Sequence, residues 1–318
     1  MINFVGINMS ENIKNILVCG LGGVGGYFGG KIAHKIAQLN EEKYKIYFLA
    51  RGLHLEEIKK NGLKLNSSNG EELVCKPTLA SDDINEIPMP DLCLICVKGY
   101  DLDDLIKLLK EKLSDKTFII PLMNGIDINE RIRKNLKKSI VLPSCVYVLS
   151  HIEKPGFIVQ SGFAGYFYTG LDPKHPNFNP KIIINFFKKM EITINWEDDP
   201  YPSLWEKYVF IAAFALITAY TGKTISGVIH DKVSNVTLKK VMGEIILIAE
   251  RKGIKLSDNL IEDIIGKTKD LDVKTSYQRD VEKGKINEGD LFGGTIIRMG
   301  KELGVPTPTT ASIYKISE

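Results

Sequence analysis

The chain of 318 residues carries almost no excess of charge of either sign. Its 42 Lys and Arg residues are nearly balanced by 39 Asp and Glu residues, which gives a formal net charge of +3. The charges are scattered along the sequence, so it lacks the clustered basic footprint that nucleic-acid binding requires. The content of 44% hydrophobic and 25% charged residues is typical of a globular protein. We therefore expect no nucleic-acid partner.

Long apolar runs are also scarce. The nearest to one is WEKYVFIAAFALITAYTG at 205–222, where Lys207 precedes about fifteen uncharged residues. The run contains threonine and tyrosine and is shorter than the about 20 apolar residues that a membrane span needs, so burial in protein is favoured. The N-terminal MINFVGINMSENIKN lacks the basic start and long apolar core of a secretory signal. These features predict a cytoplasmic protein without a membrane segment.

Cysteine is sparse and odd in number. Two of the five cysteines, Cys93 and Cys96, form a C-x-x-C pair inside DLCLICV, which has the composition of a buried strand. Side chains on a strand alternate between its faces, so a structural role is favoured over a redox or metal-binding pair. We predict no metal site. The five are Cys19, Cys75, Cys93, Cys96 and Cys145.

The first half of the chain alternates apolar, strand-like segments with helix-like ones. Continuous apolar strands in this rhythm predict a parallel sheet covered on both faces, and we expect SIVLPSCVYV at 139–148 to be a single strand. From 151 the pattern changes to short glycine-bounded strands, including GFIVQSG and GYFYTGL. The segment EDDPYPS at 197–203 has linker chemistry, and everything beyond it is helix-like. The sequence thus predicts an α/β Rossmann-type, doubly wound domain over 1–198, followed by an all-helical domain for substrate or dimerisation over 199–318.

A glycine-rich loop follows the first apolar strand in VCGLGGVGGYFGG. Gly20, Gly22 and Gly25 have G-x-G-x-x-G spacing between a strand and a helix, which is the context of a dinucleotide-binding fingerprint. The first glycine permits a tight turn, the second lets backbone approach a pyrophosphate, and the third lets helix and strand pack closely. The helix N-terminus offers free N–H groups to the phosphates. The candidate cofactor contacts are Gly20, Leu21, Gly22, Gly23, Val24 and Gly25.

The end of the second strand distinguishes NAD from NADP. An acidic residue there binds the ribose 2′-hydroxyl, whereas an arginine accommodates a 2′-phosphate. The chain reads IYFLARGLHLEE, which places Arg51 at this point. A solvated loop arginine is the alternative, but the guanidinium fork suits phosphate geometry. We predict NADPH as the cofactor.

Several sequence blocks stand out in a fixed order along the chain: GLGGVGG, LARGLHLEEIKKNGLKL, CVKGYD, PLMNGID, WEKYVFIAA, TSYQRDVEKGKINEGD and the final ELGVPTPTT. Together these blocks give the chain a resemblance to the ketopantoate reductase (2-dehydropantoate 2-reductase) family. The resemblance extends from about residue 14 to the end. It implies NADPH-dependent reduction of a 2-oxo acid to a 2-hydroxy acid, the family's reaction being ketopantoate to pantoate in pantothenate and coenzyme A biosynthesis.

The resemblance also assigns roles to residues. Lys207 matches the family's catalytic lysine, which would polarise the ketone and donate the proton. Ser276 and Glu288 match residues that bind substrate and orient that lysine. Lys98 in CVKGYD matches a cofactor contact, and Asn124 in MNGID a contact to both nicotinamide and substrate.

Each of these residues also has a structural interpretation. Lys207 could lie with its stem along an apolar surface and its charge in water. Lys98 could be a surface lysine, and Asn124 part of an ordinary Asn-Gly turn. Ser276 could simply begin a helix, and Glu288 could lie in the first turn of a helix capped by its neighbour.

Two positions depart from the family pattern. Lys207, Ile211 and Ala215 share one helix face, and ketopantoate reductases usually carry asparagine four residues after the lysine and often another four further on. Apolar groups cannot satisfy the polar groups of a substrate that expects asparagine. A more apolar 2-oxo acid, another carbonyl compound and a non-catalytic NADPH-binding sensor are the alternatives. Whether the chain forms a homodimer stays open.

Overall fold

The structure is a computed structural model that describes residues 13–317. The first twelve residues, where we expect no secretory signal, lie outside the described residues. The chain divides into two compact units. Among the described residues, the first unit comprises 13–97, Lys107–Leu122 and Leu136–Asp198, and the second comprises Lys98–Ile106, Met123–Asn135 and 199–317. Two short segments from the first half of the chain thus belong to the second unit.

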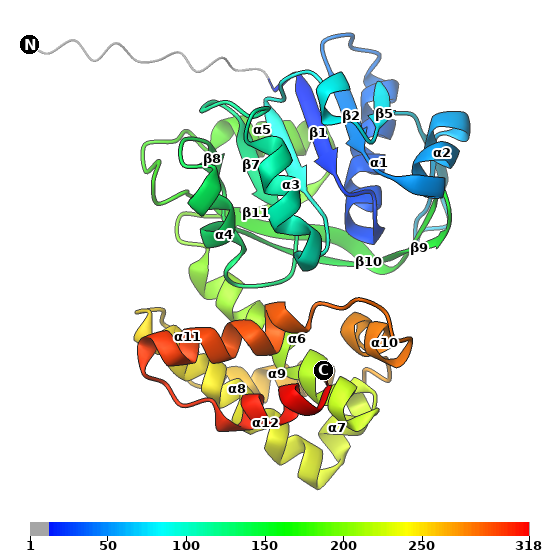
Figure 1. Ribbon diagram of the computed structural model, residues 1–318. Coiled ribbons are helices and arrows are strands. Elements are labelled where there is room, and N and C mark those ends of the chain that lie inside the picture. The colour runs from blue at the N-terminus through cyan, green and yellow to red at the C-terminus, as the bar shows by residue number, and fades with distance from the viewer. Residues whose placement is uncertain (1–12, 318) are drawn as a thin grey trace, which may run out of the picture. The chain divides into compact units, whose positions relative to one another are not determined.

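A six-stranded parallel sheet forms the centre of the first unit (Figure 1). The strand order is β5-β2-β1-β6-β7-β8, and in register Cys19 lies opposite both Leu49 and Ile95. Apart from the partly exposed Asn15, the residues of the three central strands are buried, which explains why their sequences are apolar without alternation. Their bounds are β1 Asn15–Cys19, β2 Lys45–Leu49, β5 Leu79–Ser81, β6 Leu92–Ile95, β7 Phe118–Pro121 and β8 Ile140–Val141.

A second sheet, in the order β11-β10-β3-β4 with β9 paired to β10, completes the first unit. Two strand predictions are wrong here. The segment 139–148 is interrupted at Pro143 and gives two strands, and 157–170 is one strand, not two. The bounds are β3 Leu63–Asn66, β4 Glu72–Cys75, β9 Ser144–Lys154, β10 Phe157–Gly170 and β11 Thr193–Glu197.

Helix α1 (Gly23–Leu39) packs between these two sheets. It contacts β1 and β2 of the parallel sheet and β3, β4, β9 and β10 of the second sheet. Phe28 on α1 meets Phe167 on β10 edge to face, with ring centroids 5.7 Å apart. The other helices that begin before Asp199 are α2 Gly52–Asn61, η1 Ile84–Glu86, η2 Gly99–Asp101, α3 Leu102–Leu109, α4 Ile128–Asn135 and α5 Lys181–Lys189.

Beyond Asp199 the second unit is entirely helical in the described residues (Figure 1). Helix α6 (Tyr201–Thr221) is its central element, since it contacts α7, α8, α10, α12 and the π-helical turn η3. A helix that is apolar on all sides belongs in a core, which accounts for the uncharged run after Lys207. The remaining bounds are α7 Ile225–His230, α8 Lys232–Arg251, α9 Leu260–Thr268, α10 Ser276–Glu282, η3 Asp290–Gly294, α11 Thr295–Leu303 and α12 Pro308–Ser317.

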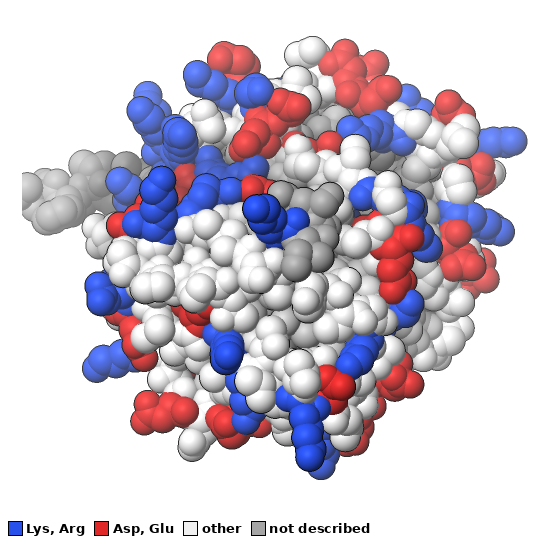
Figure 2. All heavy atoms as spheres, turned by 60° about the horizontal axis from the view of Figure 1, so that its bottom comes forward, with Lys and Arg blue, Asp and Glu red and all other residues white. Residues whose placement is uncertain are grey.

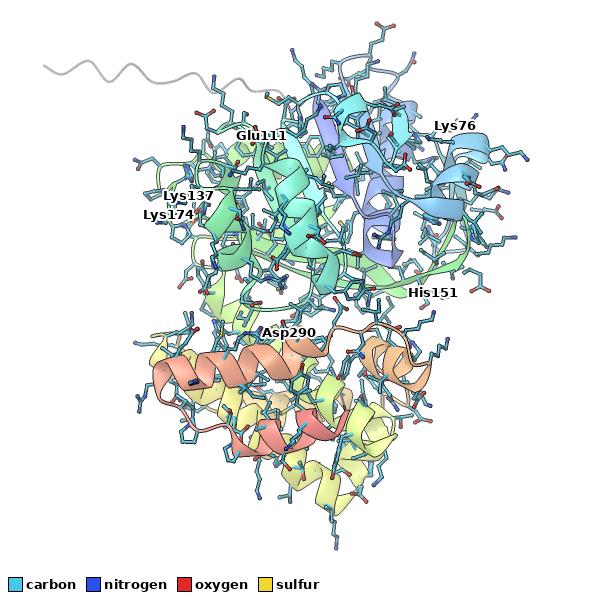
Figure 3. The ribbon with its side chains drawn as sticks, viewed as in Figure 1. Lys76, Glu111, Lys137, His151, Lys174 and Asp290 are labelled. Atoms are coloured by element: carbon cyan, nitrogen blue, oxygen red, sulfur yellow. The ribbon has the colours of Figure 1, made fainter. Side chains whose placement is uncertain are left out.

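The predicted fold class, a Rossmann-type parallel sheet followed by helices, is confirmed. On the face shown in Figure 2, basic and acidic side chains are interspersed. The side chains labelled in Figure 3 on the first unit, among them Lys76, Glu111 and Lys174, are exposed. Among residues 13–317, no helix has the length and apolar content needed to cross a bilayer.

Candidate functional site

The glycine loop joins β1 to α1. Gly20 has a φ of +87°, which strains any residue with a side chain, and a Cβ on Gly25 would lie 1.9 Å from the Gly20 carbonyl oxygen. Gly22 is different, because nothing lies within 4 Å of its Cβ position. It is the N-cap of α1, makes no side-chain cap and is followed by no acidic residue in the first turn. The loop therefore presents open backbone at an uncapped helix N-terminus, which fits a pyrophosphate.

The other three loop residues lie close to neighbouring parts of the first unit. Leu21 is 3% exposed, and Val24 packs against the core of the first unit. A Cβ on Gly23 would lie 2.2 Å from the carbonyl oxygen of Ser150 on β9. Leu21 therefore has almost no side-chain surface for a ligand, whereas Val24 is partly exposed.

Arg51 lies beside this loop because β1 and β2 are parallel neighbours. The Gly20 N–H donates to the Leu49 carbonyl at 3.0 Å, and Arg51 follows two residues later. It is exposed and extended at the N-cap of α2. The parallel register thus places Arg51 at the same sheet edge as the glycine loop.

A second set of predicted residues gathers inside the second unit. Lys98 follows β6, and its Nζ donates to Glu288 Oε2 at 2.8 Å and to Asp280 Oδ2 at 3.4 Å. Glu288 is 7% exposed and also accepts from the Gly99 N–H at 3.1 Å. Burial opposes the charge on Lys98, but the two carboxylates outweigh it and raise the pKa of Lys98. Asp280 was not predicted, although it lies one helical turn after Ser276 on α10.

Lys207 is buried in the second unit, with 7% of its surface exposed. Its Nζ donates to Asn124 Oδ1 at 3.3 Å. Asn124 follows β7 and precedes Gly125. Gly125 has a φ of +112°, a backbone conformation that would be strained for a residue with a side chain. The alternative of an outward-pointing surface lysine is therefore wrong. The structure brings Lys207 to Asn124, and it pairs Glu288 with Lys98.

The remaining candidates differ in exposure. Ile211 is partly exposed, whereas Ala215 is 1% exposed and offers little surface to a ligand. Ser276 is exposed at the first position of α10. The N-cap of that helix, Thr275, is hydrogen-bonded to Thr218 of α6 at 2.9 Å, which holds the start of α10 against α6.

The cysteines lie in the protein interior. All five are buried and free, and Cys19 Sγ lies 3.9 Å from Cys93 Sγ. Burial raises the pKa of Cys75 to about 12 and that of Cys96 further, so their reactive thiolate forms are suppressed. Across the described part of the chain, no group of three or more His, Cys, Asp or Glu side chains is arranged to hold a metal ion.

A parallel sheet with a glycine loop, followed by a helical unit, is the architecture of a nucleotide-dependent oxidoreductase of Rossmann type. The sequence model described as "Ketopantoate reductase PanE/ApbA" matches residues 16–173, and that described as "Ketopantoate reductase PanE/ApbA C terminal" matches 201–318. The chain belongs to the ketopantoate reductase family, and it is an oxidoreductase. The family is NADPH-dependent, so the cofactor is a pyridine nucleotide.

Similar proteins span nearly the whole chain. The "Uncharacterized oxidoreductase YkpB" of Bacillus subtilis (strain 168) is 28% identical over 302 residues, covering 94% of this chain and 96% of that protein. The PanE/ApbA family ketopantoate reductase from Ralstonia eutropha JMP134 has a TM-score of 0.83 at 24% identity, covering 95% and 97%. D-mandelate dehydrogenase, solved with NADH and anilino(oxo)acetate, has a TM-score of 0.82 at 18% identity, covering 95% and 97%. The last two likenesses establish the fold alone.

Proposed function

We propose that the protein reduces a 2-oxo acid to the 2-hydroxy acid with NADPH, and that Lys207 is the proton donor. The observation that supports this most is the buried Lys207 ammonium, held 3.3 Å from Asn124 Oδ1. A cation kept in a largely water-excluded place can polarise a ketone oxygen and then transfer a proton to the alkoxide. The family membership supplies the reaction class, with ketopantoate reduction as the family's reaction.

The cofactor would supply the hydride. In this proposal the backbone at Gly20–Gly25 holds its pyrophosphate, Arg51 its 2′-phosphate, and Lys98 and Asn124 the nicotinamide half. Asn124 and Ser276 orient the substrate. Glu288 acts as a fixed negative charge, and its hydrogen bonds to Lys98 and the Gly99 N–H support a positioning role.

The substrate class is the finer part of the proposal. Partly exposed Ile211 follows Lys207 by one helical turn, where the family usually has asparagine. This favours a 2-oxo acid with an apolar tail as the second candidate substrate. D-mandelate dehydrogenase, which shares the fold, was solved with anilino(oxo)acetate, so this fold also occurs in a protein with another kind of 2-oxo acid.

NADPH oxidation at 340 nm over a panel of 2-oxo acids tests the proposal. The panel should include ketopantoate, branched aliphatic and aryl 2-oxo acids, with NADH in parallel. Turnover of at least one acid with NADPH is expected. Tight NADPH binding without turnover of any acid would instead support the sensor alternative.

We further propose that residues 1–198 and 199–318 act as the nucleotide-binding and the substrate or dimerisation domains of a cytoplasmic homodimer. Light scattering after size-exclusion chromatography tests the oligomeric part. A mass near the 35.6 kDa of one chain would contradict it.

A further inference from the structure

The π-helical turn η3 begins two residues after Glu288, at Asp290, and runs into α11. Single π-helical turns are rare and occur frequently at functional sites. The Leu291 N–H at its start donates to the Glu288 carbonyl at 3.0 Å. The turn and the carboxylate that binds Lys98 are therefore parts of one short, hydrogen-bonded segment.

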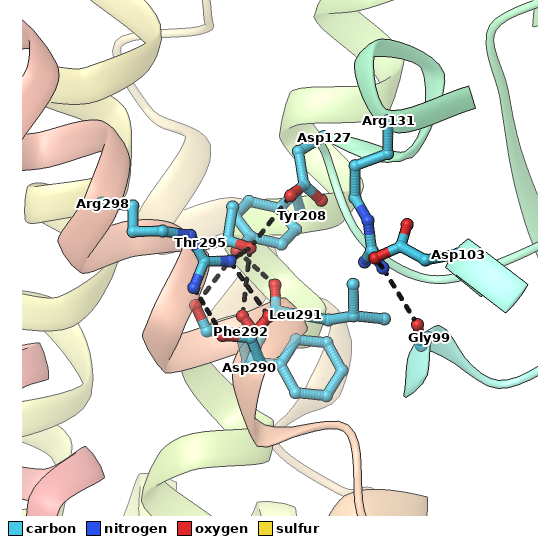
Figure 4. A network of polar contacts seen from close by, with 10 residues as sticks. All are labelled: Gly99, Asp103, Asp127, Arg131, Tyr208, Asp290, Leu291, Phe292, Thr295 and Arg298. Carbon is cyan, nitrogen blue, oxygen red and sulfur yellow. Dashed lines mark hydrogen bonds and ion pairs between the residues drawn. The ribbon is translucent and has the colours of Figure 1, made fainter. Parts of the chain in front are cut away.

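The Leu291 side chain packs against two glycines. A Cβ added to Gly99 would lie 2.4 Å from Leu291 Cδ1, and one added to Gly125 would lie 3.3 Å from Leu291 Cδ2. Figure 4 shows Leu291 extending from the turn toward Gly99. Since Gly99 follows Lys98 and Gly125 follows Asn124, one leucine contacts the backbone beside two predicted site residues.

The turn is held from the other side by Tyr208, the residue after Lys207. Its hydroxyl donates to the carbonyl oxygens of Leu291 at 2.7 Å and Phe292 at 3.2 Å (Figure 4). Tyr208 is 3% exposed, and burial raises its pKa well above the usual value, so the hydroxyl stays a donor. The contact joins helix α6, one residue from the proposed proton donor, to the turn.

Further contacts fix the end of the turn and the Gly99 loop. Thr295 Oγ1 donates to Asp127 Oδ2 at 3.4 Å, and Arg298 binds both Asp290 and Thr295 (Figure 4). Arg131 Nη2 donates to the Gly99 carbonyl at 3.2 Å. All of these residues belong to the second unit.

We propose that Tyr208 is a positioning residue: its hydroxyl holds the π-helical turn, and Leu291 on that turn fixes the loops carrying Lys98 and Asn124 relative to Lys207. The roles of those three residues rest on the proposed function. We call the contacts from Tyr208 to the turn η3, and from Leu291 to Gly99 and Gly125, the clamp. The geometry of the clamp does not rest on the proposed function, because all of these contacts lie within the second unit.

The test is Tyr208→Phe, which removes the hydroxyl and keeps the ring. Tyr27→Phe is the matched control, since Tyr27 is 2% exposed and its hydroxyl accepts from the Gly165 N–H at 2.9 Å in the first unit. Amide hydrogen exchange should become faster in 98–106 and 123–135 for Tyr208→Phe and stay at the wild-type rate there for Tyr27→Phe. With an active wild type, kcat should fall about tenfold, the effect of one lost hydrogen bond of about 1.4 kcal/mol, while KM for NADPH stays within about twofold.

Leu291→Ala is the second variant, with the equally buried Leu238→Ala on α8 as its control. It should accelerate exchange in the same two segments even though the Tyr208 hydroxyl keeps its carbonyl acceptors. Unchanged exchange in both segments for Tyr208→Phe and Leu291→Ala overturns the clamp, whether or not the wild type turns over an oxo acid. If the wild type turns over no oxo acid but amide hydrogen exchange in these segments is faster in both variants, the clamp is supported and only the proposed function is contradicted.

Discussion

Lys98 and Glu288 are 190 residues apart in sequence and form an ion pair of 2.8 Å between Nζ and Oε2. The Glu288 side chain is 7% exposed and that of Lys98 is 41% exposed. The pair therefore consists of a carboxylate inside the protein and a lysine that reaches it from the edge. Removing Lys98 would leave the buried Glu288 carboxylate without this ion pair, while the Gly99 N–H would still donate to it.

Lys98→Met should lower the free energy of unfolding by about 1 kcal/mol, near the low end for an unsatisfied buried group because Lys98 is partly exposed. Burial disfavours the charged lysine, but Glu288 and Asp280 raise the pKa of Lys98 overall. A raised lysine pKa stabilises the fold below the unfolded value of about 10.4 and loses this effect as pH rises through the folded value. Urea unfolding should thus show a constant difference from wild type between pH 7 and 9 that shrinks only in stronger alkali.

The double variant Lys98→Met/Glu288→Gln serves as the control for this prediction. It should recover part of the lost stability, because glutamine can still accept from the Gly99 N–H without carrying a charge. A double variant no more stable than Lys98→Met would show that the ion pair is not the cause.

Lys207→Ala should lower kcat by about a hundredfold to ten-thousandfold, the usual contribution of a positioned general acid. The affinity for NADPH, measured by fluorescence titration, should stay near wild type because the glycine loop lies in the first unit. Lys223→Ala is the matched control, as Lys223 follows the same helix and pairs with Asp231 at 2.8 Å. Comparable kcat values for the two alanine variants would remove Lys207 from the mechanism.

Gly22→Ala and Gly25→Ala separate a ligand contact from a structural one. A Cβ at Gly25 would meet the Gly20 carbonyl at 1.9 Å, so Gly25→Ala should lower Tm by several degrees. A Cβ at Gly22 meets nothing within 4 Å, so Gly22→Ala should leave Tm within about two degrees and raise KM for NADPH at least tenfold. Equal KM values for Gly22→Ala and wild type would argue against a pyrophosphate at this loop.

The parallel sheet could be predicted because strands that are buried on both faces have continuous apolar sequences, and such runs are easy to recognise. The second sheet was harder to recognise. Strand β10 carries Gly162 at a φ of +72° and a register shift between Ser161 and Tyr166, so its sequence resembles two strands with a turn between them. Pro143 lacks the N–H that a continuous strand needs, and it divides β8 from β9.

The candidate site could be predicted in part. Arg51 and the glycine loop follow neighbouring strand ends, so strand order alone brings them to one edge. The partner of Glu288 could not be predicted, since a contact between residues 98 and 288 depends on the tertiary fold and not on the local sequence. The structural interpretation of Glu288 does not describe its place either: Asn287 Oδ1 accepts from the Gly289 N–H at 3.0 Å, but the helical turn begins at Asp290, so Glu288 lies before its first turn.

Arg51→Ala should raise KM for NADPH by about ten- to a hundredfold, the range for loss of hydrogen bonds to a charged group, and leave KM for NADH nearly unchanged. The reason is that the two cofactors differ only in the 2′-phosphate that Arg51 is proposed to bind. Steady-state kinetics with both cofactors measures the ratio, with Lys59→Ala on α2 as a control for loss of nearby positive charge. An equal rise for both cofactors would show that Arg51 acts on something other than the 2′-phosphate.

Ile211→Asn tests whether the departure at this position sets the substrate class. Ile211 is partly exposed one turn after Lys207, so asparagine fits there without burying an unpaired amide. We expect the ratio of kcat/KM for ketopantoate to that for an apolar 2-oxo acid to rise at least tenfold. The reason is that a polar substrate can hydrogen-bond to the new amide, whereas an apolar substrate leaves that amide unpaired. Ile211→Ala is the control, since it removes the apolar bulk without adding an amide. If Ile211→Ala shifts the ratio as far as Ile211→Asn, the isoleucine acts by its volume, and the polarity argument for an apolar substrate fails.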